Sequence, residues 1–172
     1  MRAPNKLTPP IERLRELIEY DAEAGLLLWR LRSDNRWNAR FAGKAVGYSE
    51  TNGYLATAID GRRFMVHRLA WKFHFGTEPP LLIDHRDGDR LNNRPENLRE
   101  ADNSTNQANS KLRKDAAPLK GAHWNRFRGY WQSAIKIEGR TISLGRFETA
   151  EAAHAAYVEA AKRHFGDFAR AL

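Results

Sequence analysis

The segment from residue 81 to residue 109 reads LLIDHRDGDRLNNRPENLREADNSTNQAN. Its apolar start, Leu81 to Ile83, predicts a short strand, and Asp84 and His85 follow directly at the end of that strand. The loop and the polar segment behind them are crowded with Asn, at positions 92, 93, 97, 103, 106 and 109. Because a strand would hold the Asp-His pair on a rigid element, this pair is a candidate reactive site.

The chemistry of these side chains predicts a metal-dependent nuclease site. His85 can accept a proton near neutral pH and can therefore activate water as a general base. Asp84 offers a hard oxygen anion, and the presumed helix behind it offers only the amides of Asn103, Asn106 and Asn109. Oxygen ligands suit magnesium or manganese better than zinc. The plain alternative is that Asn and Asp fill ordinary turns and helix caps.

The composition favours a nucleic acid as the partner. The chain has 172 residues, of which 41% are hydrophobic, as expected for one ordinary globular domain or two small ones. It carries 29 Lys and Arg against 21 Asp and Glu, a net charge of +8, which attracts polyanions. No segment is apolar enough to span a bilayer, and no cysteine is present for a disulfide or a thiolate zinc site. The first ten residues lack a secretory signal, so we expect a cytoplasmic protein.

The N-terminal part predicts a mixture of helices and strands. Thr8 to Pro10 predicts a helix start, with the helix ending near Tyr20, and residues 26–29 predict a buried strand. Residues 33–53 are polar and predict an irregular connection. Asp60-Gly61 predicts a tight hairpin between strands at 54–59 and 62–66.

A helix is predicted over residues 67–73, stopped by Gly76. It begins at His67, for which two interpretations stay open. The side chain is either a structural histidine satisfied by a backbone partner, or a supporting residue of the site around His85.

Several of these stretches resemble the HNH endonucleases, in particular the homing-endonuclease branch of phages and mobile introns. The resemblance lies in VHRLAW at 66–71, IDH at 83–85, DGDRLNNRPENLR at 87–99 and the trailing Asn106. It implies a ββα-metal finger and a DNA phosphodiester substrate. His85, Asn97 and Asn106 match the three signature positions of the family, although the last of these is His in the pattern that names the family.

The resemblance also implies the roles of the residues. His85 would be the general base, and Asp84 and Asn106 would hold one divalent cation, Mg²⁺ or Mn²⁺. Asn97 would bond within the finger and help to orient His85. Asn at the last signature position leaves the choice among Asn103, Asn106 and Asn109 open.

Residues 119–172 predict a separate small module behind a charged linker at 113–118. Three short strands are predicted around 121–126, 130–137 and 140–146, and a helix from the N-cap Thr149 to Gly166. Basic and aromatic residues alternate on the strands, which fits a sheet that reads DNA. The candidate DNA-binding residues are Arg126, Arg128, Trp131, Lys136 and Arg140. For Trp131 and Phe147, a place in the core is the equal alternative.

This module resembles the Apetala-type DNA-binding domain of plant ethylene-response factors. The matching stretches include Lys120-Gly121, Trp131, Ile135, Leu144-Gly145 and Gly166-Asp167-Phe168-Ala169. The resemblance implies three antiparallel strands packed on one helix. The hairpin around Phe127 departs from the plant domains, so the resemblance implies no target sequence.

Together these features predict an α+β protein in four parts: an N-terminal helix and hairpin region that forms part of the nuclease domain (1–53), an HNH nuclease core (54–112), a linker (113–118) and the DNA-binding module (119–172). The predicted function is a monomeric, metal-dependent DNA endonuclease that nicks double-stranded DNA. The alternative is a DNA-binding regulator with a catalytically silent HNH scaffold. An RNA-binding protein is disfavoured, because no RNA-reading motif is present.

Overall fold

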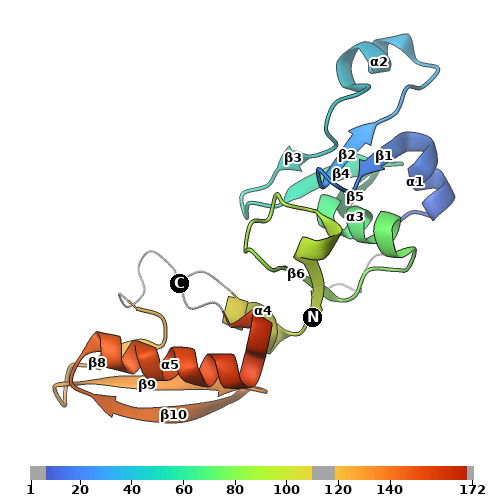
Figure 1. Cartoon of the computed structure of the whole chain (residues 1–172). Coiled ribbons are helices and arrows are strands. Elements are labelled where there is room, and N and C mark those ends of the chain that lie inside the picture. Colours follow the sequence, from blue (N-terminus) through green and yellow to red (C-terminus); the bar gives the residue numbers. More distant parts are fainter. Residues whose placement is uncertain (1–6, 110–118, 170–172) are drawn as a thin grey trace. The chain divides into compact units, whose positions relative to one another are not determined.

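The computed structural model describes residues 7–109 and 119–169. It divides into two compact units, residues 1–100 and residues 101–172 (Figure 1). Both units combine helices with small antiparallel sheets, which agrees with the predicted α+β class. The linker predicted at 113–118 lies outside the described residues. No helix in the described ranges is long and apolar enough to cross a membrane.

The first unit contains three small sheets: β1 with β2, β3 with β4 and β5, and β6 with β7. Its elements, in chain order, are α1 (Ile11–Leu17), β1 (Ile18–Asp21), β2 (Leu26–Trp29), α2 (Asn35–Phe41), β3 (Tyr48–Ser49), β4 (Leu55–Ile59), β5 (Arg62–Met65), α3 (Val66–Phe75), β6 (Leu82–His85), the 3₁₀ helix η1 (Pro95–Asn97) and β7 (Leu98–Ala101), whose last residue falls in the second unit.

One hydrophobic core joins the N-terminal elements to the strands of the predicted nuclease core. It buries apolar side chains of α1, the sheets, α3 and the segment before β3, namely Leu14, Leu17, Ile18, Leu27, Val46, Ile59, Phe64, Val66, Leu69, Ala70, Ile83 and Leu98. Leu14 and Ile83 thus belong to the same cluster, although they lie far apart in sequence. The strand that carries Asp84 and His85 is therefore fixed against the N-terminal region.

Two predictions for the N-terminal region were wrong. The first helix ends at Leu17 rather than near Tyr20, because residues Ile18–Asp21 pair as a strand with residues 26–29. Residues 33–53 are not irregular throughout, since they form α2 and β3. Asp34 caps α2 by accepting hydrogen bonds from the backbone N–H groups of Arg36 and Trp37.

The hairpin prediction is confirmed. β4 and β5 pair in antiparallel register around Asp60 and Gly61. These two residues have φ angles of 48° and 73°, which a two-residue turn of this kind requires at both central positions. α3 follows β5 without a break and ends at Gly76 in the left-handed conformation, as predicted.

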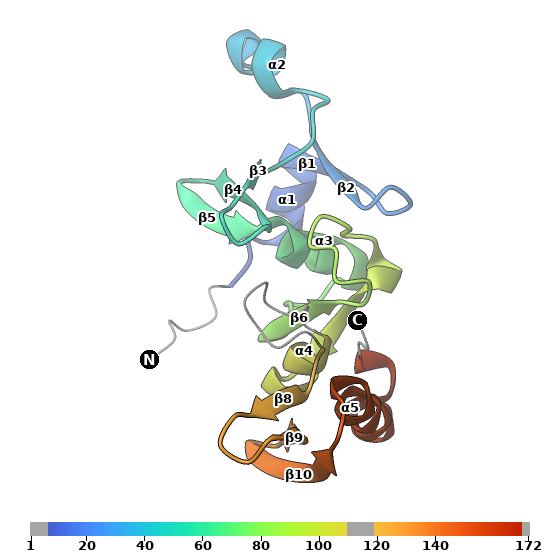
Figure 2. The same ribbon diagram turned by 90° about the vertical axis from the view of Figure 1, so that its left-hand side faces the viewer.

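The second unit is a three-stranded antiparallel sheet in the order β10, β9, β8, with α5 lying across one face (Figures 1 and 2). Its elements are α4 (Asn103–Asn109), β8 (Ala122–Asn125), β9 (Tyr130–Ile137), β10 (Arg140–Phe147), α5 (Ala150–Phe165) and the 3₁₀ helix η2 (Gly166–Phe168). The predicted strands and helix of residues 119–172 are confirmed. Thr149 caps α5 by accepting from the N–H of Ala152 at 3.1 Å.

The helix lies very close to the sheet in this unit. The alanines of α5 allow this, since Ala153 and Ala161 are buried. At Gly121 the approach leaves no room for a side chain, because an added Cβ would lie 2.2 Å from the ring of Tyr157.

β6, β7 and α4 follow one another in ββα order along the chain. By its contacts, however, α4 belongs to the second unit, where it touches α5 and η2. Lys120 of the second unit contacts α4 by donating a hydrogen bond from Nζ to the backbone oxygen of Ala108. The ββα-metal finger therefore stays a prediction.

Candidate active site

The Asp84-His85 pair lies at the end of β6, as predicted, and both side chains are buried. The exposed fraction is 5% for Asp84 and 3% for His85. Ile83, in the same strand, packs in the core of the unit, so the strand cannot shift without disturbing that core. The pair is therefore held rigidly, and its surroundings control its chemistry.

Asn93 is the amide that faces His85. The distance from His85 Nε2 to Asn93 Oδ1 is 3.3 Å. The side chain of Asn93 is itself fixed, because its Nδ2 donates to the backbone oxygen of Leu91 at 3.2 Å. Asn93 is 2% exposed, so this contact is shielded from solvent.

Two further rings pack around His85. The rings of His67 and His85 meet edge to face, with centroids 5.5 Å apart. Tyr54 packs against both, at 5.0 Å from His67 and 5.8 Å from His85. The guanidinium of Arg90 lies over the ring of Tyr54, 4.8 Å from its centroid. The sequence left two interpretations of His67 open, and the structure places its ring directly against His85.

Burial keeps both histidines neutral. It lowers the pKa of His67 to about 3, with smaller contributions from the nearby His85 and Arg68. Burial also lowers the pKa of His85, opposed by its hydrogen bond to Asn93 and by the carboxylate of Asp87. A neutral imidazole is the form that can accept a proton.

Asp84 forms a buried ion pair with Arg99 of β7. The Nε and Nη2 atoms of Arg99 both lie 2.8 Å from Asp84 Oδ2. The two side chains are 6% and 7% exposed, so the pair is sheltered from water. It joins the two strands of the β6–β7 sheet, a partner for Asp84 that the sequence analysis did not foresee.

Asn97 organises the loop that follows His85. Its Oδ1 accepts from the N–H of Asp87 at 3.0 Å, and its Nδ2 donates to the carboxylate of Asp87 and to the backbone oxygen of Asn92. Its backbone oxygen also accepts from Arg86 at 2.9 Å. These bonds pin both ends of the loop between β6 and Asn97.

The β1–β2 hairpin supports Asn93 from the other side. The hydroxyl of Tyr20 donates to the backbone oxygen of Asn93 at 2.9 Å. Gly25, in the hairpin turn, lies so close to the site loop that an added Cβ would be 2.7 Å from the backbone nitrogen of Arg94. Residues 18–29, to which the sequence analysis gave no role in the site, thus help to hold the residue that contacts His85.

The asparagines predicted as metal ligands lie on α4. Asn106 begins the hydrogen bonding of the helix, with its N–H donating to Asp102 at 3.0 Å, and its side chain is half-buried. Asn103 is exposed, whereas Asn109 is buried. These three asparagines belong to the second unit, whereas Asp84 belongs to the first.

The sheet register divides the predicted DNA-binding residues between two faces. Trp131 lies opposite Trp124 and shares its face of β9 with Ser133 and Ile135, which are buried on the side that α5 covers. Lys136 points to the other face. Arg140 pairs with Ile137, which puts it on the same face as Trp131.

Arg126 and Arg128 lie in the turn between β8 and β9. Asn125 closes this turn by accepting at Oδ1 from the N–H groups of Phe127 and Arg128, both at 3.2 Å. Phe127 stands between the two arginines and is 97% exposed. Arg146, which the sequence analysis did not single out, shares the face of Lys136 and lies over the ring of Tyr130 at 5.0 Å.

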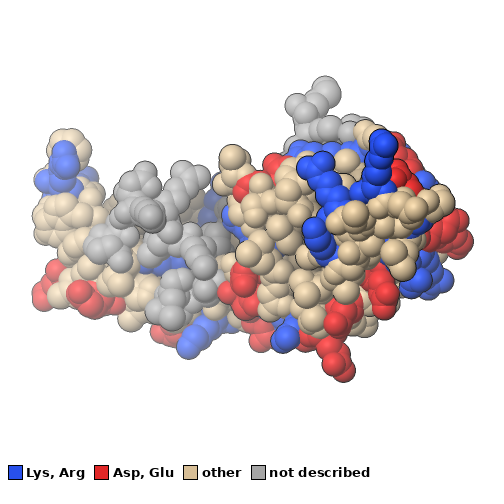
Figure 3. All heavy atoms as spheres, turned by 90° about the horizontal axis from the view of Figure 1, so that it is seen from above, with Lys and Arg blue, Asp and Glu red and all other residues tan. Residues whose placement is uncertain are grey.

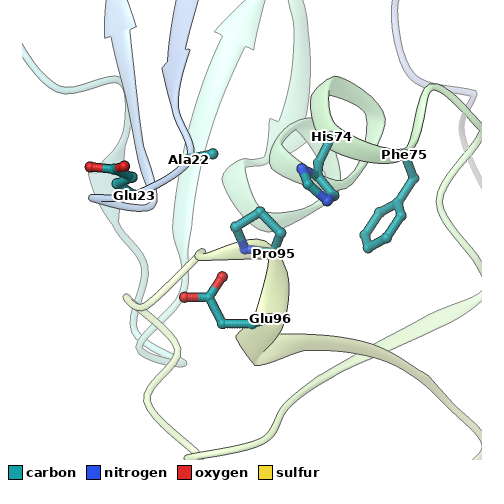
Figure 4. Close-up of a pocket in the computed structure, with 6 residues that line it drawn as sticks. All are labelled: Ala22, Glu23, His74, Phe75, Pro95 and Glu96. Atoms are coloured by element: carbon teal, nitrogen blue, oxygen red, sulfur yellow. The ribbon is translucent and has the colours of Figure 1, made fainter.

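A surface pocket of about 450 Å³ lies elsewhere in the first unit. It is lined by Ala22, Glu23, His74, Phe75, Pro95 and Glu96 (Figure 4). The two carboxylates, Glu23 and Glu96, repel a polyanion. Across residues 7–109 and 119–169, no three His, Asp or Glu side chains are grouped so that they could hold a metal ion, and the pocket is no exception.

The model of the HNH endonuclease family matches residues 64–108. This segment begins in β5, contains α3, β6 and β7, and ends in α4, so that it includes His67, His85 and Asn93. Comparison with curated proteins and with solved structures gave no match. The family match supports an HNH nuclease domain in this part of the chain, and the module of β8 to α5 lies outside it.

Proposed function

We propose that this protein is a metal-dependent DNA endonuclease that hydrolyses phosphodiester bonds, with His85 as the general base. The observation that carries the proposal is the buried His85 held against Asn93 at the end of a core strand, inside the segment that matches the HNH endonuclease family. An HNH nuclease domain implies DNA as the substrate.

The contact with Asn93 selects the nitrogen of His85 that acts as the base. When the amide oxygen of Asn93 accepts, Nε2 carries the proton and the lone pair lies on Nδ1. Nδ1 then takes the proton from the attacking water. The packed ring of His67 adds no positive charge, because its own pKa is about 3. Tyr54 and His67 therefore hold the imidazole without protonating it.

The proposed ligands fit a hard divalent cation. Asp84 offers a carboxylate and Asn106 an amide oxygen, and magnesium commonly binds proteins through one or two such ligands, with water and substrate phosphate completing its shell. When bound, the cation offsets the negative charge that develops on the scissile phosphate and the leaving oxygen. Asn97 keeps the loop behind His85 in place through Asp87 and Asn92.

The second unit would provide much of the DNA affinity, as its resemblance to Apetala-type domains suggests. Arg126 and Arg128 lie at the hairpin tip and Lys136 on the face away from α5, and in this proposal all three contact phosphates. Trp131 and Arg140 lie on the face that α5 covers. We therefore assign Trp131 to packing and Arg140 to the edge of the module. A monomer with one such site cuts one strand at a time, and nicking in the cytoplasm of a bacterial or phage-infected cell is the activity proposed.

The ion pair of Asp84 with Arg99 favours one second candidate. A carboxylate already paired with a guanidinium attracts a cation less strongly, as expected in a DNA-binding regulator whose HNH fold is a silent scaffold. The two candidates differ in a single property, namely whether the protein cleaves DNA when magnesium is present.

The test is the nicking of supercoiled plasmid by the full-length protein in magnesium, beside His85→Ala and His85→Asn. Loss of nicking in both variants, with DNA affinity within a few-fold of the original, is expected, since a general base acts in the transition state. Thermal unfolding would show that both variants fold. Equal nicking by the variants would refute the role of His85, and no nicking by the original protein would favour the regulator.

A further inference from the structure

The segment from Arg30 to Lys44, which contains α2, is the most basic stretch of the first unit that no predicted site uses. It carries five basic side chains, Arg30, Arg32, Arg36, Arg40 and Lys44, against the single acid Asp34, a surplus of four in a chain of net charge +8. Asp34 is used to cap α2. We call this segment the α2 arm.

The α2 arm does not contribute to the core. α2 has no buried residue, and none of its side chains is in the core cluster. Figures 1 and 2 both show it beyond the β1–β2 hairpin, away from β6 within the first unit. A helix of seven residues is too short to be stable alone, so local contacts must hold it.

Those local contacts are unusually well developed. Asn38 accepts at Oδ1 from the N–H of Arg32 at 2.8 Å, and donates from Nδ2 to the oxygen of the same residue at 2.5 Å. Trp37 packs edge to face on Trp29, with centroids 5.4 Å apart. The guanidinium of Arg32 lies 3.7 Å from the centroid of Trp37. The arm is thus a built structure rather than a loose loop.

The exposed arginines of the arm are placed at a cost to folding. Arg36 and Arg40 lie four residues apart on α2, on one face, and both are exposed. Like charges at this spacing destabilise a helix by about 0.2–0.5 kcal/mol. No acid in the first turn of α2 offsets them. In Figure 3, Lys and Arg side chains gather over the part nearest the viewer, where the α2 end of the unit lies.

We propose that the α2 arm binds the phosphate backbone of duplex DNA and forms a contact surface separate from the His85 site and from the C-terminal sheet. This inference rests on the proposed endonuclease function for its partner. Arg36 and Arg40 contact phosphates, while Arg32, Trp37 and Asn38 hold the helix that presents them. Complementary charge identifies the partner.

The experiment compares two full-length double variants with the same loss of charge. Arg36→Ala/Arg40→Ala changes the arm, and Arg15→Ala/Arg62→Ala changes two exposed arginines of α1 and β5. Alanine favours helix formation, so α2 should persist. Affinity for a duplex oligonucleotide is measured over a range of salt concentrations, and thermal unfolding checks the fold.

The arm variant should bind more weakly, and its salt slope should be shallower by about 1.8 logarithmic units, or about 0.9 for each lost phosphate contact. The control variant should keep the original slope. Equal slopes in the two variants would overturn the proposal. Binding to structured RNA and to vesicles of anionic phospholipid is measured in parallel. A loss of affinity in the arm variant for one of these alone, and not for duplex DNA, would also overturn the proposal.

Nicking separates this inference from the proposed function. At saturating enzyme, the arm variant should nick supercoiled plasmid as fast as the original protein, because Asp84, His85 and Asn93 are intact. If the original protein nicks but the arm variant binds with an unchanged slope, only the inference about α2 fails. If the original protein neither nicks nor binds duplex DNA, the proposed function fails.

Discussion

Arg99 places both Nε and Nη2 at 2.8 Å from one oxygen of Asp84, and the two buried side chains join β7 to β6 directly beside His85. A buried ion pair adds little net stability compared with an apolar pair, but removing one partner leaves the other charge stranded. The pair therefore has a structural role whether or not Asp84 also binds a cation.

Arg99→Met should destabilise the first unit by about 3–5 kcal/mol, because it strands the carboxylate of Asp84 in a buried position. The matched control is Arg63→Met, which removes an exposed partner of Glu50 and should cost about 1 kcal/mol or less. Denaturant unfolding of both variants provides the measurement. Similar losses in the two variants would show that the buried pair has no special importance.

Asn93→Leu should slow nicking about 10–100-fold, the loss that is typical when the hydrogen-bond partner of a metal-ligating histidine is removed and that we expect here for the general base. DNA affinity should change little, because Asn93 is buried and faces His85 rather than the surface. The comparison is Asn92→Leu, whose amide bonds Asp87 instead and should slow nicking less. A larger loss in the Asn92 variant would mean that loop shape, and not the contact with His85, limits the reaction.

The stability of the first unit should fall as the pH falls from about 6.5 toward 3, because of His67. Its pKa is about 3 when folded and near the ordinary histidine value of 6.5 when unfolded. Between these values the unfolded state binds one more proton, so stability is present above the unfolded pKa and is lost on acidification, by about 1.4 kcal/mol per pH unit. The neighbours that face it are His85, Tyr54 and Arg68.

His67→Phe should flatten this pH dependence, whereas His74→Phe, at an exposed position on the same helix, should leave it unchanged. Denaturant unfolding at a series of pH values measures the slopes. His85 is also buried with a lowered pKa, so the variant should retain part of the slope. An unchanged slope in His67→Phe would contradict the burial of a neutral imidazole at this position.

The metal should be needed for cleavage and not for the fold. Chelator should stop nicking, and magnesium or manganese should restore it, because Asp84 and the asparagines of α4 offer only oxygen ligands. Thermal unfolding should be nearly the same with and without chelator, since the first unit has a core of its own. Cooperative unfolding in chelator would mean that the metal is structural.

Local chemistry made the best predictions from the sequence. Asp60-Gly61 specifies a tight turn by its own backbone angles, and Thr149 caps α5 with its own hydroxyl, so neighbours in sequence decide both features. The end of α1 was mispredicted because residues 18–21 pair with residues 26–29, and that pairing outweighs the helical spacing of Ile18. α2 had a readable signal in Asp34, a good N-cap residue.

The site required tertiary information. Sequence placed Asp84 and His85 at a strand end correctly, but it could not choose Asn93 as the amide facing His85. That choice depends on the loop shape, which Tyr20 fixes from 73 residues away. The place of Trp131 was readable in principle, since the period of two along β9 puts it on the face of the apolar Ile135.

The two faces of the C-terminal sheet give the last prediction. Lys136 lies on the face away from α5, and Arg140, at the start of the next strand, lies on the face of Ile137. Both are exposed and both carry one positive charge, so they form a matched pair. If the face away from α5 contacts DNA, Lys136→Ala should weaken duplex binding and reduce its salt slope by about 0.9 logarithmic units. Arg140→Ala should leave the slope near that of the original protein, and Glu159→Ala on α5 should do the same. Affinity measured against salt concentration in the full-length protein decides the matter, and a larger change in Arg140→Ala than in Lys136→Ala would assign DNA binding to the other side of the sheet.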